Sequence, residues 1–145
     1  MKMKMLLIAL GVFTLSSWAL EYKILTTVES IVPMGIGRSR IIESKEKVTA
    51  EDKAQHHTKD SKDKNKASRD DVKIEEYDET TLLNFYSGVG INFQNIASND
   101  ALVAEKITEL SSEGWVLVFV TSAVESDAGE KDGKGIFITR YIFKR

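Results

Sequence analysis

One segment dominates what this chain can fold into: residues 43–80 carry so much charge that they can add almost nothing to a hydrophobic core. They hold 9 Lys or Arg and 12 Asp or Glu among 38 residues. Between Glu43 and Asp71 the only large apolar side chain is Val48. Such a composition buries too little apolar area to offset the entropy of ordering the chain. We therefore predict a disordered charged linker at about 43–80 and a core built from the two flanking parts of the chain.

The charges of this linker are unevenly distributed. Its first part, 43–69, has 8 basic and 6 acidic residues, whereas 70–80 has 1 basic and 6 acidic residues. One interpretation is a tail that binds a charged partner, and the other is a solvated insertion between two strands. We favour the insertion, because runs of charge usually remain solvated.

The first residues, "MKMKMLLIALGVFTLSSWA", have the organisation of a signal peptide. Lys2 and Lys4 precede an apolar run over 5–15, and small residues at the end supply a cleavage site after Ala19. A buried N-terminal helix is the alternative. The apolar run is shorter than the about 20 residues that a membrane span needs. We predict a signal peptide at 1–19 and a single domain at 20–145 that is periplasmic or secreted, with no integral membrane span after cleavage.

Cysteine content and charge narrow the function further. The chain has no Cys, so it has neither a disulfide nor a lipid-bearing cysteine. Without Lys2 and Lys4 it would carry 18 basic against 22 acidic residues, a net charge of −4. Together with export, this balance argues against nucleic acid as a partner.

Two segments on either side of the linker are predicted to be strands. In "YKILTTVESIV" the apolar residues alternate, which predicts a half-buried strand, followed by a turn at "VPMGIG" and a second strand at "RSRII". After the linker, "LLNFYSGVGINF" alternates again and predicts another strand, with glycines at a bulge or close approach. The predicted buried face is Tyr22, Ile24, Val28 and Val32 in the first strand, and Leu83, Phe85, Val89, Ile91 and Phe93 in the later one.

A helix is predicted next, ending at Gly114. Val103, Ile107 and Leu110 recur with helical spacing, and Ser98, Asn99 or Asp100 is expected to cap the first turn. A glycine is common where a helix ends in the left-handed conformation.

The helix leads into "WVLVFV", which is apolar on both faces. Such a strand is predicted to be central in its sheet, with Trp115 in the core between helix and sheet. The last strand, "IFITRYIF", is nearly as apolar, and "ESDAGEKDGKG" joins the two as a polar hairpin loop. The fold class that follows is α+β: a mostly antiparallel sheet of four to five strands, one packed helix and a long disordered insertion.

These elements resemble a small bacterial family called domain of unknown function 4177. The resemblance rests on a tyrosine-bearing first strand, a Gly-Trp passage from helix to strand and a Lys-Arg end, and it covers about half of the mature chain. The family implies a small α+β domain without an assigned activity. This chain departs from the pattern at Ser111, at Val116 and in its long insertion. The matching residues are Tyr22, Leu110, Gly114, Trp115, Leu117, Val118, Lys144 and Arg145.

No arrangement of residues predicts a catalytic, metal or cofactor site. The only histidines, His56 and His57, lie in the predicted linker, so a base for nucleophilic catalysis is missing from the core. With Asp52 and Asp60 they could bind a metal only weakly, because a mobile segment supplies no fixed supporting contacts.

Three arginines form the only candidate ligand site. Arg38 and Arg40 are two residues apart and share a strand face, and Arg140 is expected on a neighbouring strand. Their guanidinium groups suit a carboxylate or a phosphate. The interpretation we favour is that they pair with surface acids such as Glu29 or Glu43.

The sequence favours a non-catalytic binding or structural module of the cell envelope. The alternative is a domain that binds a small carboxylate or phosphate ligand, or an enzyme whose site is not recognisable. One helix covers one sheet face, so the second apolar face must be covered by a curled sheet, a homodimer or another envelope protein. We place the homodimer slightly ahead of the curled sheet.

Overall fold

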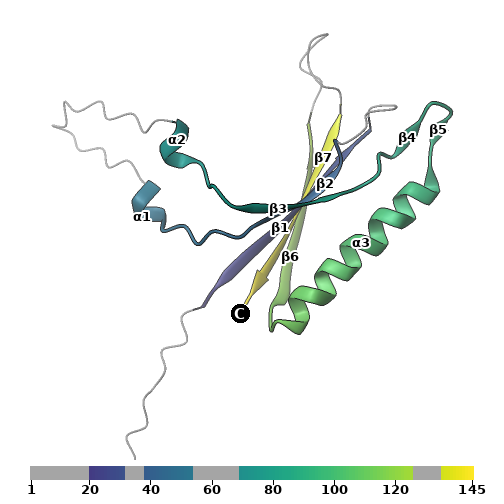
Figure 1. Ribbon diagram of the computed structural model, residues 1–145. Coiled ribbons are helices and arrows are strands. Elements are labelled where there is room, and N and C mark those ends of the chain that lie inside the picture. Colours follow the sequence, from purple (N-terminus) through teal and green to yellow (C-terminus); the bar gives the residue numbers. More distant parts are fainter. Residues whose placement is uncertain (1–19, 32–37, 54–68, 126–134) are drawn as a thin grey trace, which may run out of the picture.

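The computed structural model describes residues 20–31, 38–53, 69–125 and 135–145. These residues form a five-stranded sheet in the order β3-β2-β1-β7-β6, a separate two-stranded hairpin and a long helix, α3, that lies over one face of the sheet (Figure 1). The α+β prediction is confirmed, with every strand pair antiparallel. The elements are β1 (Tyr22–Ser30), β2 (Arg40–Ser44), α1 (Ala50–Lys53), α2 (Arg69–Val72), β3 (Tyr77–Thr81), β4 (Tyr86–Ser87), β5 (Gly90–Ile91), α3 (Phe93–Ser112), β6 (Val116–Val124) and β7 (Ile136–Lys144).

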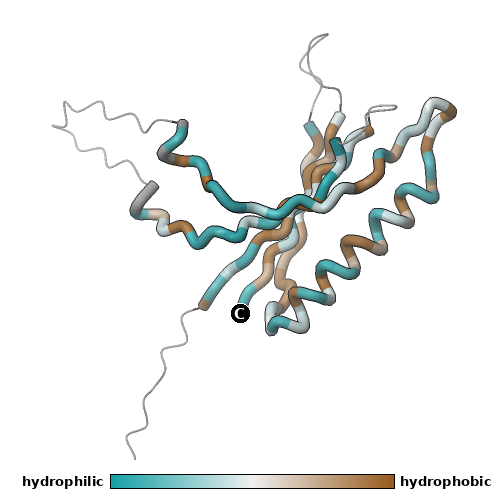
Figure 2. The backbone as a smooth tube through the Cα atoms, viewed as in Figure 1, coloured by the Kyte–Doolittle hydropathy of each residue, from teal (hydrophilic) through white to brown (hydrophobic). Residues whose placement is uncertain are grey.

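The core lies between α3 and the middle of the sheet. Leu25 of β1 and Phe143 of β7 are fully buried there, and Leu110 of α3 is buried against them. Hydrophobic residues gather in β1, β6, β7 and α3, whereas the segments around α1, α2 and β3 are largely hydrophilic (Figure 2). The full buried cluster is Leu25, Ile41, Leu82, Leu110, Trp115 and Phe143. Trp115 is therefore a core residue, as predicted from the sequence.

Strand β1 turns the opposite face toward the helix from the one predicted. Leu25 and Thr27 are buried under α3, whereas Tyr22 and Ile24 are 62% and 48% exposed on the other face. The physical reason is that the helix packs on the row containing Leu25, which the register places beside Tyr141 of β7. The apolar alternation correctly indicates a strand but names the wrong face.

The helix begins earlier than predicted and ends where predicted. Its N-cap is Asn92, whose side-chain oxygen accepts from the backbone N–H groups of Gln94 and Asn95, so residues 98–100 lie inside the helix. At the other end, Gly114 has φ +91°, the left-handed conformation expected of a glycine after a helix.

The segment 82–93 is not the continuous strand that its alternation predicts. It forms the short hairpin β4-β5 and then enters α3 at Phe93. Gly90 has φ +123°, which breaks the extended conformation that a long strand requires. Leu83, Ile91 and Phe93 of the predicted buried face are exposed, and Val89 is exposed completely, whereas Leu82 is buried.

The predicted linker at about 43–80 is too long at both ends. Glu43 belongs to β2 and is buried, and Tyr77–Thr81 forms β3, which pairs with β2. Residues 54–68 of this segment, the turn at 32–37, the hairpin loop at 126–134 and the predicted signal peptide at 1–19 lie outside the described residues.

Candidate interaction surface

Strand β6 lies at the edge of the sheet, which corrects the prediction that it is central. Its only described neighbour is β7, and each of its nine residues is exposed. The sequence "VLVFVTSAV" contains no charged residue. Phe119 is 59% exposed on one face and Val124 is 59% exposed on the other. An apolar, uncharged edge strand of this length is a template for pairing with another strand.

Part of the β6 backbone also has its hydrogen-bonding groups directed away from the sheet. The N–H of Glu125 donates to the carbonyl of Ile136, and in an antiparallel pair alternate residues turn their backbone groups to the same side. The backbone groups of Val120, Ser122 and Val124 therefore point away from β7. Among the described residues no strand lies on that side.

The helix lies close to β6, to which the turn at Gly114 joins it, yet all nine residues of β6 remain exposed. The buried cluster takes side chains from β1, β2, β7 and α3, together with Leu82 after β3 and Trp115 before β6, and none from β6 itself. The register places Leu117, Val120 and Val124 on the same face as Phe143 and Tyr141, which is the helix side of the sheet. An apolar row thus continues beyond the area that α3 covers.

The opposite edge of the sheet, β3, has a different character. Its sequence is "YDETT", and both acids are engaged by cations of β2 or the residue after it. Asp78 lies 3.0 Å from the ammonium group of Lys45, and Glu79 lies 2.6 Å from the guanidinium group of Arg40. Charged side chains on an edge strand oppose pairing with another copy. The two edges are therefore not equivalent as interaction surfaces.

The start of β6 is held by a cationic stack on Trp115. The guanidinium group of Arg145 lies 4.4 Å from the ring centroid, and the ammonium group of Lys23 lies 5.2 Å from it. Arg145 also donates to Glu21 at 2.5 Å, and the backbones of these two residues exchange hydrogen bonds. These contacts lower the pKa of the Glu21 carboxyl, chiefly through the hydrogen bond from Arg145.

An open groove of about 670 Å³ adjoins this stack. Its walls carry both signs of charge, so it offers no field that selects an anion or a cation. Its acids are Glu21, Glu46 and Glu113, and its bases are Lys23, Lys45, Lys47 and Arg145.

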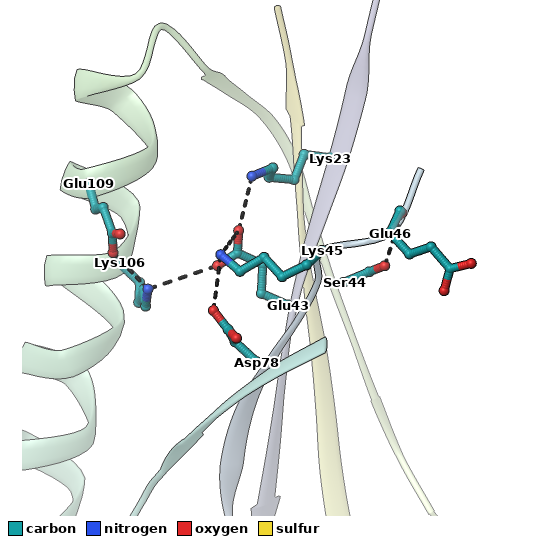
Figure 3. A network of polar contacts seen from close by, with 8 residues as sticks. All are labelled: Lys23, Glu43, Ser44, Lys45, Glu46, Asp78, Lys106 and Glu109. Atoms are coloured by element: carbon teal, nitrogen blue, oxygen red, sulfur yellow. Dashed lines mark hydrogen bonds and ion pairs between the residues drawn. The ribbon is translucent and has the colours of Figure 1, made fainter. Parts of the chain in front are cut away.

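A buried carboxylate, Glu43, joins the sheet to the helix (Figure 3). Its oxygens lie 2.9 Å from Lys23, 3.3 Å from Lys45 and 3.9 Å from Lys106 of α3. Burial raises the pKa of Glu43, but the hydrogen bonds and charges of Lys23 and Lys45 outweigh burial and hold this pKa below its ordinary value. Glu43 is thus an ionised structural anchor whose oxygens are already engaged by cations.

The three predicted arginines are not gathered into one site. Arg40 pairs with Glu79, rather than with the predicted Glu29 or Glu43. Arg140 lies on β7 opposite Thr26, so β1 separates its strand from β2. Arg38 is exposed and precedes β2. The pairing of a strand arginine with a surface acid was foreseeable, but the acid came from β3, which the sequence had placed in the linker.

Sequence reasoning missed Asn99, which was expected at the start of the helix. It is buried in the interior of α3, where its side chain accepts from the N–H of Leu83 at 2.8 Å and donates to the carbonyl of Leu83 at 2.7 Å. It also donates to Glu29 at 3.2 Å. A polar residue on the apolar face of a helical pattern was the available signal.

The described ranges hold neither a metal-binding cluster nor a membrane-spanning helix. These contain no group of three or more His, Cys, Asp or Glu placed to hold a metal ion. Nor does any helix in the described part of the chain have the length and apolar character to cross a membrane. His56, His57 and Asp60 lie outside the described residues.

Comparisons with known proteins add no assignment. No family model, no curated protein and no solved structure matches the chain. The resemblance to domain of unknown function 4177 stays a prediction.

Proposed function

We propose that this protein is an exported, non-catalytic module of the cell envelope that binds a protein partner through strand β6. The observation that carries the proposal is the edge strand itself, which is nine residues long, uncharged, largely apolar and exposed throughout. The partner is either a second copy of the chain or another envelope protein. Export rests on the signal-like sequence of residues 1–19.

The chemistry of β6 supports a protein as the ligand. Its outward backbone N–H and carbonyl groups can form main-chain hydrogen bonds with an added strand, and its alternate side chains can pack on the partner. Exposed apolar area beyond a few hundred Å² usually marks a surface that another protein covers. Small polar ligands would find few charged or hydrogen-bonding side chains there.

The alternative function, binding of a small carboxylate or phosphate, has weaker support. Arg40 already pairs with Glu79, and the groove beside Trp115 is lined by acids as well as bases. The described residues offer no acid-base pair for an enzymatic role, since Glu43, the most buried carboxylate among them, is engaged by lysines.

Photo-crosslinking in the cells that make the protein tests this proposal. The photoreactive amino acid benzoylphenylalanine replaces Phe119 of β6 in one variant and Phe93 of α3 in the matched control. Both positions are exposed aromatics, at 59% and 77%, so neither replacement disturbs the core. We expect a protein adduct from position 119 and none from position 93. Absence of an adduct from 119, or equal adducts from both positions, contradicts a binding surface at β6.

A further inference from the structure

We infer that the partner at β6 is a second copy of this chain, joined by antiparallel pairing of β6 with β6 across a two-fold axis. This inference rests on the proposed function and specifies its partner. The result is one continuous sheet that runs through both copies, with the acidic β3 strands as its two outer edges. Pairing of this kind makes three structural demands on β6: compatibility with itself, a regular stretch of edge, and enough contact area.

The first demand is that β6 be compatible with itself. A two-fold axis places identical residues close together, so a charged residue near the axis would meet its own charge. Strand β6 has no charged residue, whereas β3 has two acids within five residues. Self-pairing is therefore free of charge repulsion at β6, whereas at β3 it would crowd charged side chains that already form ion pairs with Arg40 and Lys45.

The second demand is a regular stretch of free edge. The pairing of β6 with β7 shifts register between Leu117 and Phe119, and from Phe119 to Val124 it is regular. A bulge disturbs the ladder and bends a strand, so the new pairing is confined to the regular part. The two-fold axis then lies near Thr121 and Ser122, the middle of that part. Small hydroxyl side chains facing their own copies across strands form favourable pairs.

The third demand is that pairing cover more than the strand edge. A stable interface needs about 800 Å² from each partner, which is more than one row of backbone groups supplies. When the two sheets become continuous, a two-fold axis perpendicular to the sheet brings both α3 helices to the same face. The exposed row on the helix side of β6 then lies between the two helices. Its apolar members are Leu117, Val120 and Val124.

The absence of cysteine makes the geometry testable with single substitutions. Directly opposed residues in an antiparallel pair have Cα atoms about 4.5–5.5 Å apart, within the range that a disulfide spans. We expect Thr121→Cys or Ser122→Cys to form a disulfide-linked dimer under mild oxidation. Thr81→Cys, on the exposed edge β3, is the matched control and should stay monomeric on a non-reducing gel. No linked dimer from either β6 position, or equal linkage at Thr81, overturns the inference.

Sedimentation equilibrium of the purified protein, in the form that cells produce, tests the association without a crosslink. We expect a dimer mass for the wild type. For Val120→Lys, which puts a charge into the apolar row between the two helices, we expect a monomer mass and a circular dichroism spectrum like that of the wild type. Thr81→Lys, at the other edge, should remain a dimer. A wild type that is monomeric from micromolar to millimolar concentration overturns the inference, and so does a dimer that survives Val120→Lys. If the purified protein is monomeric but position 119 still crosslinks to a different protein in cells, the proposed function stands without its two-fold partner.

Discussion

Replacing Glu43 by Gln removes one negative charge from the junction between sheet and helix while keeping the shape of the side chain. The wild-type carboxylate lies 2.9 Å from the ammonium group of Lys23 and 3.3 Å from that of Lys45, with Lys106 at 3.9 Å. Only 4% of the Glu43 side chain is exposed, so water cannot replace these contacts on the acid. The lysines keep some access to water, at 23% exposure for Lys23 and 40% for Lys45.

These contacts determine how much stability the substitution removes. A hydrogen bond to a charged group contributes about 1.5–3 kcal/mol, and the lysines regain part of their hydration when the carboxylate is removed. We therefore expect Glu43→Gln to lower the free energy of unfolding by about 2 kcal/mol at neutral pH. A whole domain has only about 5–15 kcal/mol, so the loss is readily measured.

The pH dependence separates charge from packing. The pKa of Glu43 is lowered in the folded protein, so its stabilisation is fully present above the ordinary pKa of 4.5 and is lost as the pH falls through the folded value. The difference between wild type and Glu43→Gln should therefore shrink in acid. Urea unfolding at one fixed protein concentration, followed by circular dichroism from neutral to acidic pH, measures it.

Glu29 provides a control, because its ionised carboxylate is expected to affect the free energy of unfolding in the opposite direction. Burial is the main cause that raises its pKa, outweighing the hydrogen bond from Asn99, so its ionised form destabilises the folded state. Glu29→Gln should leave stability unchanged in acid and raise it as the pH increases through the folded pKa. A Glu43→Gln loss that is equal at every pH would refute the reasoning, because the effect would then belong to packing and not to charge.

Two further predictions concern the core and the N-terminus. Trp115→Ala should lower the free energy of unfolding by about 3–5 kcal/mol in the same urea assay, because it removes a buried aromatic ring. The control Val116→Ala, at a neighbouring side chain that is 57% exposed, should change stability by less than about 1 kcal/mol. Equal losses would contradict the assignment of Trp115 to the core. Intact-mass analysis of the exported protein should show a chain that begins at Leu20, after cleavage behind Ala19, and a chain that retains Met1 would contradict the signal peptide.

Local signals in the sequence predicted the helix, its end at Gly114 and the burial of Trp115 just after it. Helical spacing of apolar residues, a glycine at position 114 and the tryptophan after it act within a few residues of one another, so no distant contact is needed to interpret them. The predicted end at Gly114 and the burial of Trp115 are both confirmed.

The faces and partners of the strands could not be predicted in the same way. In β1 both rows are partly apolar, and the choice between Leu25 and Ile24 as the buried row depends on where α3 lies. Strand β3 has almost no apolar signal, and its order comes from pairing with β2 and from the ion pairs of Asp78 and Glu79. Composition cannot reveal contacts that are formed by residues far away in the chain.

The error at β6 bears on function as well as on fold. Apolar residues on both faces of "WVLVFV" predict a strand with neighbours on both sides, yet among the described residues β6 pairs only with β7. No described strand curls across the second face of the sheet, because the five strands form one open order. Pairing at β6 completes the edge of the sheet and leaves that face as it is. Pairing of β6 with its copy supplies the missing neighbour and places the strand at the centre of the combined sheet. In that assembly the residue pattern and the structure agree, because the uncharged strand β6 becomes central and the charged strand β3 forms the outer edge. Loss of the dimer in Val120→Lys, with the monomer still folded, is the outcome that this explanation requires.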